Sequence, residues 1–492
     1  MPYAVGIDVG TTNYKLVLCS LPECETVSID RFQCPKIFEG TFTDYDVEAL
    51  VNGITHALHG CAQKLAQESS EIKFISIASV GESGVLVNHD GSYSKKSICW
   101  FDTRGEEYVR HIYHAGLDRW LFGITGIPAH SNSALFKILW LRDHGVDLHG
   151  ATWLPMADFI AWVLCGSFGQ DATLASRTSV LDLRTGSVSK EVLRHFKLPK
   201  KLFPKVIPSG VSRGAIRDKI AQETGLPLDC QVHVTGHDHM SGSVACGFDT
   251  QSESLNSTGT SEGILMVGGM PNLDDELYAR QVTNGLYVNE GSYSRYSSLP
   301  TAGFSFEWAL NALGVAADRF FSIEQFDLHK RYLAKEFDDT SVLFIPHLRG
   351  SGPPRRNPNS RGVFAGIGEN SSQDELLFAV HLGVALELRN LYQSMGIADM
   401  SRMKVIGPAI KNPLWMQLKA DILGIPVIAC DIQEAVARGA IMIAAKSYGG
   451  TSELTCIEQE YTPDIEHVAL LEDIFTTRYM PLSDAIACWE NA

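Results

Sequence analysis

Two strand–turn–strand segments with similar sequences lie about 250 residues apart in this chain of 492 residues. In the first, the apolar run 3–9 leads through a Gly-Thr-Thr turn into a second apolar run, 15–19. In the second, residues 253–258 lead through a Gly-Thr-Ser turn into the apolar run 263–267. Short runs of strand-forming residues on both sides of a glycine turn are typical of β-hairpins. A repeat spaced by half the chain predicts two similar domains, each contributing one hairpin to a shared cleft.

The length of the chain agrees with such a division. A chain of 492 residues exceeds what one hydrophobic core usually supports, so two or three domains are expected. Strand-like runs occur between segments of helical periodicity, such as residues 46–65. We predict an N-terminal domain over residues 1–247 and a C-terminal domain over residues 248–492, with a C-terminal tail from about residue 448.

The turns of the two hairpins have the composition of phosphate-binding loops. Such a turn presents successive backbone N–H groups and hydroxyls, the arrangement that cradles phosphate oxygens. Asp8 ends the first strand and suits a hard cation such as Mg²⁺ held through water, and Lys15 supplies a point charge for phosphates. One such turn alone is more often an ordinary hairpin, but two in one chain favour binding of a polyphosphate. The candidate residues of the first turn are Gly10, Thr11, Thr12 and Asn13.

A third stretch, residues 232–240, predicts a strand that stops at a glycine and turns into a helix. A β-branched run is interrupted by Gly236, and the small residues 241–245 are compatible with a helix. Ligands of α/β proteins bind at the carboxyl ends of strands, so Asp238, which opens the next element, is a candidate catalytic residue. Asp is also a favoured helix N-cap, and on the local sequence alone this simpler interpretation has equal weight.

Other segments suggest the surroundings of a polar ligand. Glu82 follows a buried type of strand, 74–80, and Trp100 lies close in sequence to an acid and an arginine, which suits a ligand with an apolar face. Packing in the core is an equally good interpretation of Trp100. Residues 171–186 have the composition of a polar connector. The segment 374–395 is apolar on all sides of a helix, which predicts a helix buried between the two domains.

Composition excludes several classes of protein. A formal net charge of −16 argues against a nucleic-acid-binding surface and fits a protein that handles small molecules. The eleven cysteines are scattered and form no C-x-x-C motif, which indicates a reducing compartment. Neither a basic leader nor an apolar stretch of about 20 residues is present, so we expect no signal peptide and no membrane span. A cytoplasmic location is therefore expected. The oligomeric state is left open, with a homodimer as one candidate.

Several ordered motifs together resemble the FGGY carbohydrate kinases, which belong with actin, hexokinase and the 70-kDa heat-shock proteins. The resemblance extends from Gly6 to about Ala445. The motifs that carry it are Gly6-Ile7-Asp8-Val9-Gly10-Thr11-Thr12, Trp100-Phe101-Asp102-Thr103-Arg104, Thr235-Gly236-His237-Asp238, Ser257-Thr258-Gly259-Thr260-Ser261 and the segment from Gly407 to Gly424. The resemblance implies an α/β fold with two ribonuclease-H-like domains of the actin and hexokinase type that flank a cleft. It also implies ATP and Mg²⁺, and transfer of the γ-phosphate to a hydroxyl of a small-molecule sugar or polyol.

The resemblance also implies roles for residues of this sequence. Asp238 matches the general base of the family, and Asp8 lies near the metal. Residues that match the two phosphate hairpins are Asp8, Gly10, Thr11, Thr12, Asn13, Lys15, Gly259 and Thr260. Comparison with the glycerol kinase branch places Glu82, Trp100, Asp238 and His239 at the sugar. Residues that match nucleotide-contacting positions are Gly303, Glu307, Gly407, Ala409 and Asn412.

Two departures from the family pattern concern the nucleotide. The adenosine loop, usually rich in glycine, reads Gly407-Pro408-Ala409-Ile410 here, and proline lacks the N–H that a backbone contact would use. Glu262 follows the second hairpin turn directly and adds a negative charge near the phosphates unless it points away. Similarity around residues 236–238 and 260–265 is greatest with the fuculokinase-like branch, which does not fix a substrate.

The hypothesis is phosphoryl transfer to a five- or six-carbon ketose or polyol, with Asp238 as the base that accepts the hydroxyl proton. An ATP-driven conformational protein of the heat-shock or actin type would share the paired hairpins but needs no sugar site. A metal-dependent hydrolase is a third interpretation, in which His237, Asp238 and His239 are metal ligands. No partner cluster with ligand spacing is visible elsewhere in the sequence to support it.

Overall fold

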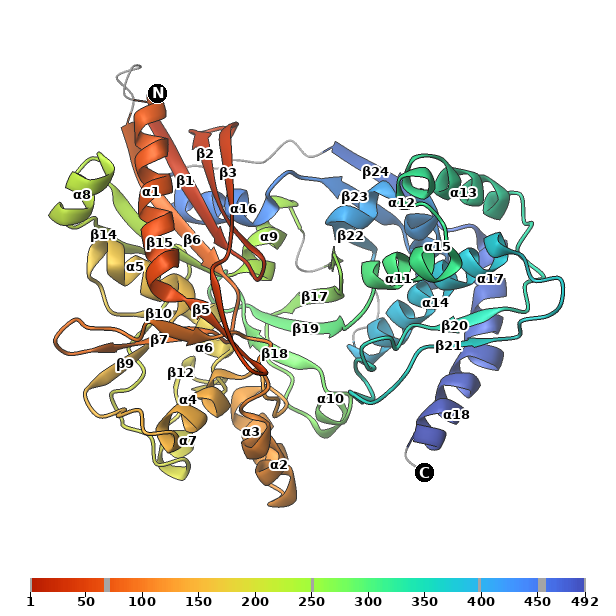
Figure 1. The fold of residues 1–492 in the computed structure, drawn as a ribbon, viewed down its shortest axis with the longest axis horizontal. Coiled ribbons are helices and arrows are strands. Elements are labelled where there is room, and N and C mark those ends of the chain that lie inside the picture. Colours follow the sequence, from red (N-terminus) through yellow and green to blue (C-terminus); the bar gives the residue numbers. More distant parts are fainter. Residues whose placement is uncertain (1, 66–70, 249–251, 397–399, 450–456, 491–492) are drawn as a thin grey trace.

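The computed structural model describes residues 2–65, 71–248, 252–396, 400–449 and 457–490, which form two lobes built on two large β-sheets (Figure 1). The N-terminal sheet has the strand order β14-β15-β6-β1-β2-β3. β1, β2 and β3 are antiparallel neighbours, whereas β1, β6 and β15 run parallel. The strands are β1 (Pro2–Val9), β2 (Asn13–Ser20), β3 (Thr26–Gln33), β6 (Glu71–Ser79), β14 (Ser212–Ala215) and β15 (Gln231–His237).

The C-terminal sheet has the order β18-β19-β17-β16-β22-β23-β24. β16, β17 and β19 are antiparallel neighbours, and β16, β22 and β23 run parallel. Both sheets thus have an antiparallel hairpin whose first strand lies beside two parallel strands, and an antiparallel strand (β14 or β24) follows at that edge. The strands are β16 (Glu253–Thr258), β17 (Glu262–Gly268), β18 (Thr283–Leu286), β19 (Tyr293–Leu299), β22 (Arg402–Ile406), β23 (Val427–Asp431) and β24 (Ile457–Tyr461).

The sequence repeat therefore corresponds to a repeat of topology. Each predicted hairpin is present, as β1–β2 and as β16–β17, and each is the first hairpin of its sheet. This is the ribonuclease-H-like α/β arrangement that the sequence predicted. The division of the chain at residue 247 stays a prediction, and a helix of the second half, residues 435–445, packs on the N-terminal sheet.

Helices cover both faces of the N-terminal sheet. α1 (Val47–Leu65) buries Leu50, Ile54, Leu58, Cys61 and Leu65, which recur every three or four residues and form one apolar stripe. It packs with α8 (Asp218–Thr224) and on strands β2 and β6, and α5 (Met156–Cys165) packs beside it on β6 and β15. The apolar stripe explains why this helix lies flat on the sheet.

The opposite face is covered by α9 (Asp238–Ala245) and α16 (Ala435–Ala445), which comes from the far end of the chain (Figure 1). Glycines allow the close contacts: a Cβ on Gly6 of β1 would lie 2.2 Å from the carbonyl oxygen of Ala437, and a Cβ on Gly439 would lie 1.9 Å from that of Ser241. Because α16 fits tightly between β1 and α9, it fixes the position of the helix that Asp238 begins.

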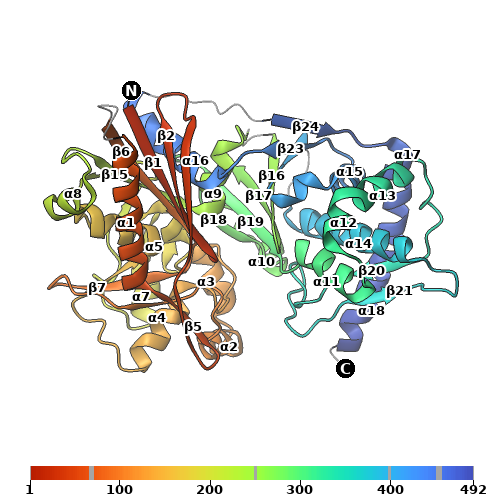
Figure 2. The ribbon, with the colours of Figure 1, turned by 45° about the horizontal axis from the view of Figure 1, so that its top comes forward.

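The helix predicted between the domains lies elsewhere. α14 (Gln373–Ser394) is buried on nearly all sides, but it packs within the C-terminal lobe against α11 (Gly303–Leu313), α15 (Pro413–Leu423), β19 and β20 (Leu343–Ile345). The prediction was wrong because an apolar surface all round a helix indicates burial and not the identity of the neighbours. Figure 2 shows α14 inside the right-hand lobe, among α11, α15 and β20.

Residues 84–203 form most of a subsidiary unit below the N-terminal sheet, with a hydrophobic core of its own. Here β7 (Gly84–Asn88) pairs with β9 (Ala151–Pro155) and four helices pack around them. These helices are α2 (Glu106–His114), α3 (Asp118–Thr125), α4 (Ala134–Asp143) and α7 (Lys190–His195). The unit forms part of the cavity wall described below.

The remaining elements are short strands, short helices and the C-terminal helices. The segment from residue 457 is not a loose tail: β24 joins the C-terminal sheet, and Tyr461, Leu471 and Phe475 belong to the C-terminal core. The other elements are β4 (Lys36–Glu39), β5 (Phe42–Asp46), β8 (Lys96–Ile98), β10 (Gln170–Asp171), α6 (Ala172–Ser176), β11 (Leu181–Asp182), β12 (Ser187–Val188), β13 (Val206–Ile207), α10 (Asp275–Ala279), α12 (Ala317–Arg319), η1 (Phe320–Glu324), α13 (Gln325–Leu333), β21 (Val363–Ala365), η2 (Pro408–Lys411), η3 (Lys446–Tyr448), α17 (Ile465–Asp473), η4 (Ile474–Tyr479) and α18 (Met480–Glu490).

Cysteines do not cross-link the part of the chain that is described. No disulfide joins any two of the ten cysteines within it, and the eleventh, Cys456, lies outside the described residues. No helix in the described part is both long and apolar enough to cross a membrane.

Candidate active site

A cavity of about 340 Å³ lies between the two lobes, and both halves of the chain line it. Thr11 from the first hairpin turn and Ser261 from the second both face it, as does Asp238. The two turns therefore lie on the same side of the molecule, at one cleft. The predicted sugar-contacting residues Glu82, Trp100 and His239 line the same cavity.

Asp238 is the first residue of α9, directly after β15, so the strand-to-helix corner is present as predicted. Its Oδ1 accepts a hydrogen bond from the backbone N–H of His239 at 2.7 Å. The side chain is 21% exposed, and burial raises its pKa to about 7, helped by the negative charge of Glu82. His237, and not Asp238, occupies the N-cap position, and its side chain makes no capping bond. The simple N-cap interpretation of Asp238 is therefore wrong.

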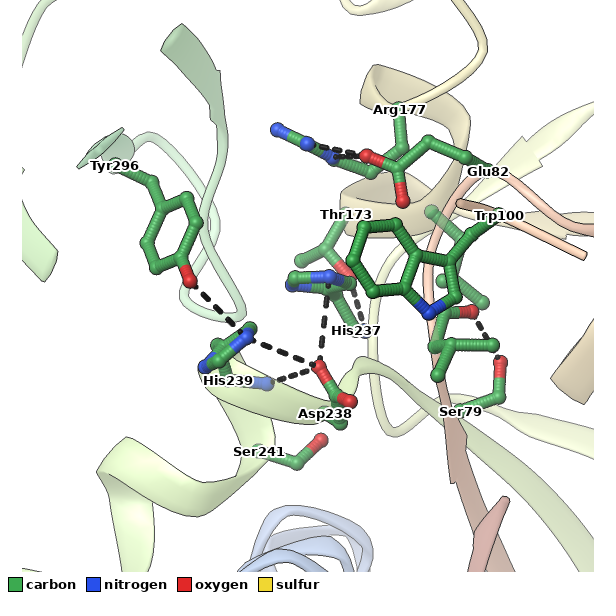
Figure 3. Close-up of polar contacts among 12 residues, drawn as sticks. Ser79, Glu82, Trp100, Thr173, Arg177, His237, Asp238, His239, Ser241 and Tyr296 are labelled. Atoms are coloured by element: carbon green, nitrogen blue, oxygen red, sulfur yellow. Dashed lines mark hydrogen bonds and ion pairs between the residues drawn. The ribbon is translucent and has the colours of Figure 1, made fainter. Parts of the chain in front are cut away.

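Two histidines flank Asp238. His237 Nε2 lies 3.4 Å from Asp238 Oδ1, and His239 Nε2 lies 3.1 Å from the hydroxyl of Tyr296 on β19 (Figure 3). Burial lowers the pKa of His237 well below its ordinary value and that of His239 to about 4, so both rings are neutral at neutral pH. Neutral rings can hydrogen-bond to Asp238 and to a ligand without adding a positive charge beside the carboxylate.

Glu82 forms an ion pair with Arg177, which follows α6 (Figure 3). Arg177 Nε donates to Glu82 Oε1 at 2.7 Å, and the side chains are only 16% and 8% exposed. Glu82 has a φ of 59°, a left-handed backbone conformation that is uncommon outside glycine and is found at constrained functional positions. Arg177 was missed by the sequence analysis, which assigned residues 171–186 to a polar connector.

Trp100 connects the cavity floor with the first hairpin. Its indole N–H donates to Thr11 Oγ1 at 2.8 Å. The carbonyl oxygen of Trp100 in turn accepts from Lys137 Nζ at 2.8 Å, and the same ammonium donates to the carbonyl oxygen of Asn132 at 2.7 Å. Lys137 is fully buried, and burial lowers its pKa to about 7. It therefore ties together two loops that line the cavity.

Side chains of alternating charge run from the first hairpin to the start of α16. Lys15 Nζ lies 3.5 Å from Asp8 Oδ2 and 2.8 Å from Glu434 Oε2, which directly precedes α16, and Glu434 also pairs with Arg31. Burial raises the pKa of Asp8 to about 7 although Lys15 opposes the shift. Asp8 Oδ1 is buried and has no hydrogen-bond partner among the described residues. An unsatisfied carboxylate oxygen at this position fits a hard cation carried with its own water molecules.

The turns themselves offer backbone donors. Gly10 N–H donates to the carbonyl oxygen of Asn13 at 3.0 Å, and Gly259 N–H donates to that of Ser261 at 2.8 Å, so each turn is closed internally. The N–H groups of Thr11, Thr12, Thr260 and Ser261 have no acceptor within the described part of the chain. Groups of free N–H donors in tight turns are suited to anionic oxygens.

The predicted nucleotide residues gather around the second hairpin. Gly303 N–H donates to the carbonyl oxygen of Gly259 at 3.0 Å, and a Cβ on Gly303 would lie 2.5 Å from that oxygen. Gly407 has a φ of 100° and packs on Thr258, whose hydroxyl accepts from Ala409 N–H at 3.3 Å. Glu307 is exposed, one helical turn after Gly303. Glycine is needed at both positions because the backbones approach so closely.

Asn412 is buried, and its side chain is already engaged. Its Oδ1 caps α15 by accepting from Trp415 N–H at 3.0 Å, and its Nδ2 lies 3.0 Å from His381 Nε2. Its backbone is engaged as well, because the N–H donates to the carbonyl oxygen of Ala409 at 2.9 Å and the carbonyl oxygen accepts from Met416 N–H at 3.1 Å. Pro408 is the first residue of the short helix η2, a position where the missing N–H is tolerated.

Glu262 points away from the cavity. Its Oε2 lies 2.6 Å from Lys419 Nζ, and both side chains are fully buried in the C-terminal lobe. Its charge is therefore matched by Lys419 and not directed at the phosphate turns.

Known protein families match both halves of the chain. Residues 3–245 match the N-terminal domain of the FGGY family of carbohydrate kinases, and residues 255–448 match the C-terminal domain. The chain belongs to the FGGY family of carbohydrate kinases. It is thus a phosphotransferase that acts on a hydroxyl of a sugar or polyol, with ATP as the phosphate donor.

Individual relatives of this FGGY kinase are named after different substrates. The chain is 23% identical over 458 residues to a xylulose kinase of Staphylococcus xylosus, covering 90% of this chain and 91% of that protein. It is 26% identical over 472 residues to a glycerol kinase of Saccharopolyspora erythraea, with 91% and 90% covered. The structure of a ligand-bound xylulose kinase from Lactobacillus acidophilus is similar with a TM-score of 0.90 and 22% identity, covering 99% of both chains.

The alternatives from the sequence do not fit this FGGY kinase. Family membership contradicts a conformational protein without sugar phosphorylation. The described residues contain no group of three or more His, Cys, Asp or Glu side chains placed to hold a metal ion, so His237, Asp238 and His239 do not form a hydrolase-type metal centre.

Proposed function

We propose that this FGGY kinase transfers the γ-phosphate of ATP to a hydroxyl of a five- or six-carbon ketose or polyol, with Asp238 as the general base. One observation carries the proposal: a carboxyl group with a pKa of about 7 faces a cavity that both Gly-Thr turns also face. A base whose pKa lies near the working pH is ionised in a large fraction of the molecules and still binds a proton well.

In the proposed reaction, the attacking hydroxyl lies against an oxygen of Asp238. As the oxygen of the attacking hydroxyl bonds to the γ-phosphorus, the bond from phosphorus to the β,γ-bridging oxygen breaks, ADP leaves and the hydroxyl proton moves to Asp238. The backbone of His239 and the ring of His237 hold the carboxylate on its other side. Such a base typically contributes about 10²- to 10⁴-fold to the rate.

The phosphate oxygens are assigned to the free N–H groups of the two turns, and Lys15 supplies positive charge beside the first. Asp8 is the residue that would hold Mg²⁺, which neutralises phosphate charge when bound. The sugar is assigned to Glu82, Trp100 and His239, with Arg177 holding Glu82. The ring of Trp100 offers an apolar face, and the carboxylate of Glu82 can accept hydrogen bonds from two sugar hydroxyls.

Asp238→Asn tests the base without changing the size of the side chain. ATP and substrate affinities, measured by isothermal titration calorimetry, should stay within about threefold, while turnover in a coupled ADP-release assay should fall by 10²- to 10⁴-fold. The matched control is Asp229→Asn, which removes an exposed carboxylate just before β15 and should leave turnover unchanged. An Asp238→Asn enzyme with normal turnover would refute the role of this residue.

A further inference from the structure

One wall of the substrate cavity carries a cation without a counter-ion. Arg356 belongs to the loop between β20 and β21, and its side chain lines the cavity. Within the described part of the chain it makes no hydrogen bond and no ion pair. Its position contrasts with that of Arg177, whose charge is neutralised by Glu82.

The loop that holds Arg356 is closed on itself. Ser351 N–H donates to the carbonyl oxygen of Asn357 at 2.9 Å, and Ser351 Oγ donates to that of Arg355 at 2.6 Å. Arg355 is directed to the outside, where it pairs with Asp484 of α18. Adjacent arginines thus have different surroundings: one pairs with an acid at the surface, and Arg356 faces the cavity.

Among the residues that the structure describes, no acidic side chain balances Arg356. Burial lowers its pKa first, the charge of Arg177 lowers it further, and only Tyr113 and Tyr296 act in the opposite direction. Arg177 also acts on Asp238, whereas Asp238 has no such influence on Arg356. The cavity wall thus carries two arginines, and only Arg177 has a carboxylate partner among the described residues.

His130 contributes a second donor near Arg356 in the cavity wall. Its Nδ1 accepts from the backbone N–H of Asn132 at 3.2 Å, so the neutral ring carries its proton on Nε2. Burial and then the charge of Arg356 lower the pKa of His130 to about 4, which keeps the ring neutral. Both His130 and Asn132 line the cavity. Arg356, His130 and Asn132 thus give this part of the cavity wall a guanidinium, an imidazole N–H and an amide. None of these three side chains is negative.

We propose that the substrate of this kinase is a polyhydroxy acid, whose carboxylate pairs with Arg356 while a hydroxyl at the other end of the chain reaches Asp238. A planar guanidinium binds a carboxylate through two parallel hydrogen bonds, and the pair is strong where water is excluded. A neutral polyol in the same position leaves the arginine without its partner. The inference rests on the proposed function for the phosphoryl transfer and for Asp238 as the base, and it replaces the ketose or polyol with an acid of the same chain length.

The test compares matched substrates that differ only at one end. Aldonates and the alditols of the same configuration, such as gluconate with glucitol and xylonate with xylitol, are screened at five and six carbons by coupled ADP release. The wild-type enzyme should turn over at least one acid with a kcat/KM about 100-fold above that of its alditol. Ketoses of the same length are included in the screen.

Arg356→Gln then identifies the residue that selects the acid. It should lower kcat/KM for the preferred acid by about 100-fold, mainly through KM, and change that for the alditol by less than about threefold. Arg355→Gln is the matched control from the same loop and should behave like the wild type with both. Equal losses for acid and alditol in Arg356→Gln would overturn the inference, because the arginine would then act on the phosphates or on closure of the cleft.

The outcomes separate this inference from the proposed function. Turnover of ketoses or alditols without any acid keeps the kinase proposal and overturns the polyhydroxy-acid proposal. Absence of ADP release with every acid, alditol and ketose overturns both.

Discussion

The indole N–H of Trp100 donates to the hydroxyl of Thr11 at 2.8 Å, so a residue assigned to the sugar is hydrogen-bonded to a residue assigned to the phosphates. Thr11 lies in the first hairpin turn, and the loop of Trp100 is held from below by the buried Lys137. A ligand that presses on the indole ring can therefore affect the phosphate turn directly, through a single hydrogen bond.

This contact predicts energetic coupling between the two residues. Trp100→Phe keeps an aromatic face but removes the N–H, and Thr11→Val removes the hydroxyl at nearly constant volume. We expect the double variant to lose less than the sum of the single variants, with a coupling free energy of about 0.5–1.5 kcal/mol in kcat/KM for ATP. Additive losses in the double-mutant cycle would show that the bond has no role in turnover.

The raised pKa values predict the acid limb of the pH profile. Asp238 must be ionised to accept a proton, so kcat should fall about tenfold per pH unit below an apparent pKa near 7 and level off above it. Asp8 also has a pKa of about 7 and must be ionised to hold a cation, so kcat/KM for ATP should fall more steeply. Steady-state rates from pH 5.5 to 9 measure the acid limb of kcat and that of kcat/KM for ATP.

His239→Gln is the control for this assignment. Because burial lowers the pKa of His239 to about 4, the ring does not titrate in this range, and the variant should retain the acid limb near pH 7 even if its rate is lower. An acid limb that disappears in His239→Gln would assign the titration to the histidine and not to Asp238.

The raised pKa of Asp238 predicts that removing its charge stabilises the folded protein. Because the folded pKa of Asp238 is raised, the native state binds the proton more tightly than the unfolded chain. The stability from this group is fully present below about pH 4 and is lost as the pH rises through 7. At pH 8, Asp238→Asn should therefore unfold at a higher temperature than the wild type, by on the order of 2–4 kcal/mol in free energy of unfolding.

Thermal unfolding followed between pH 4 and pH 8 checks this prediction. The difference between Asp238→Asn and the wild type should shrink steadily towards pH 4, whereas Asp229→Asn should show no such trend because that side chain is exposed. A variant that is less stable than the wild type at pH 8 would mean that the ionised carboxylate is stabilised by the site.

The parts of the site that form within one short segment could be predicted from the sequence. The hairpins β1–β2 and β16–β17 and the corner at Asp238 each depend on a local pattern of apolar residues and glycines. The repeat of the hairpins predicted two similar domains, whereas the ribonuclease-H-like arrangement of the sheets was predicted from the family resemblance. The hairpins and the corner are encoded by neighbours in the chain, so hydrophobic periodicity and turn residues are sufficient to find them.

Contacts between distant segments could not be predicted in this way. Arg177, Tyr296 and Arg356 come from three separate connections or strands, and nothing in their local sequence marks them as cavity residues. The same reason explains the error over α14, whose burial was predicted correctly but whose neighbours were not. Which faces of distant elements meet is decided by packing of the whole fold, as the close contacts of α16 with Gly6 and α9 illustrate.

The buried ion pair between Glu262 and Lys419 predicts a loss of stability without a loss of ATP affinity. Glu262→Ala leaves an ammonium group in the C-terminal core without its counter-charge, which should cost about 3–5 kcal/mol in free energy of unfolding. Since the carboxylate does not face the turns, KM for ATP of the folded variant should stay within about twofold. Denaturant unfolding and steady-state kinetics measure the two quantities separately.

The double variant Glu262→Leu with Lys419→Met distinguishes the charge from the packing. Apolar side chains of similar size remove both charges together, and such replacements are often neutral or stabilising, so this variant should recover most of the stability lost in Glu262→Ala. If Glu262 instead acted on the phosphates, Glu262→Ala would bind ATP more tightly because a negative charge near them had been removed. A tighter KM with unchanged stability would therefore contradict the burial of this carboxylate beside Lys419.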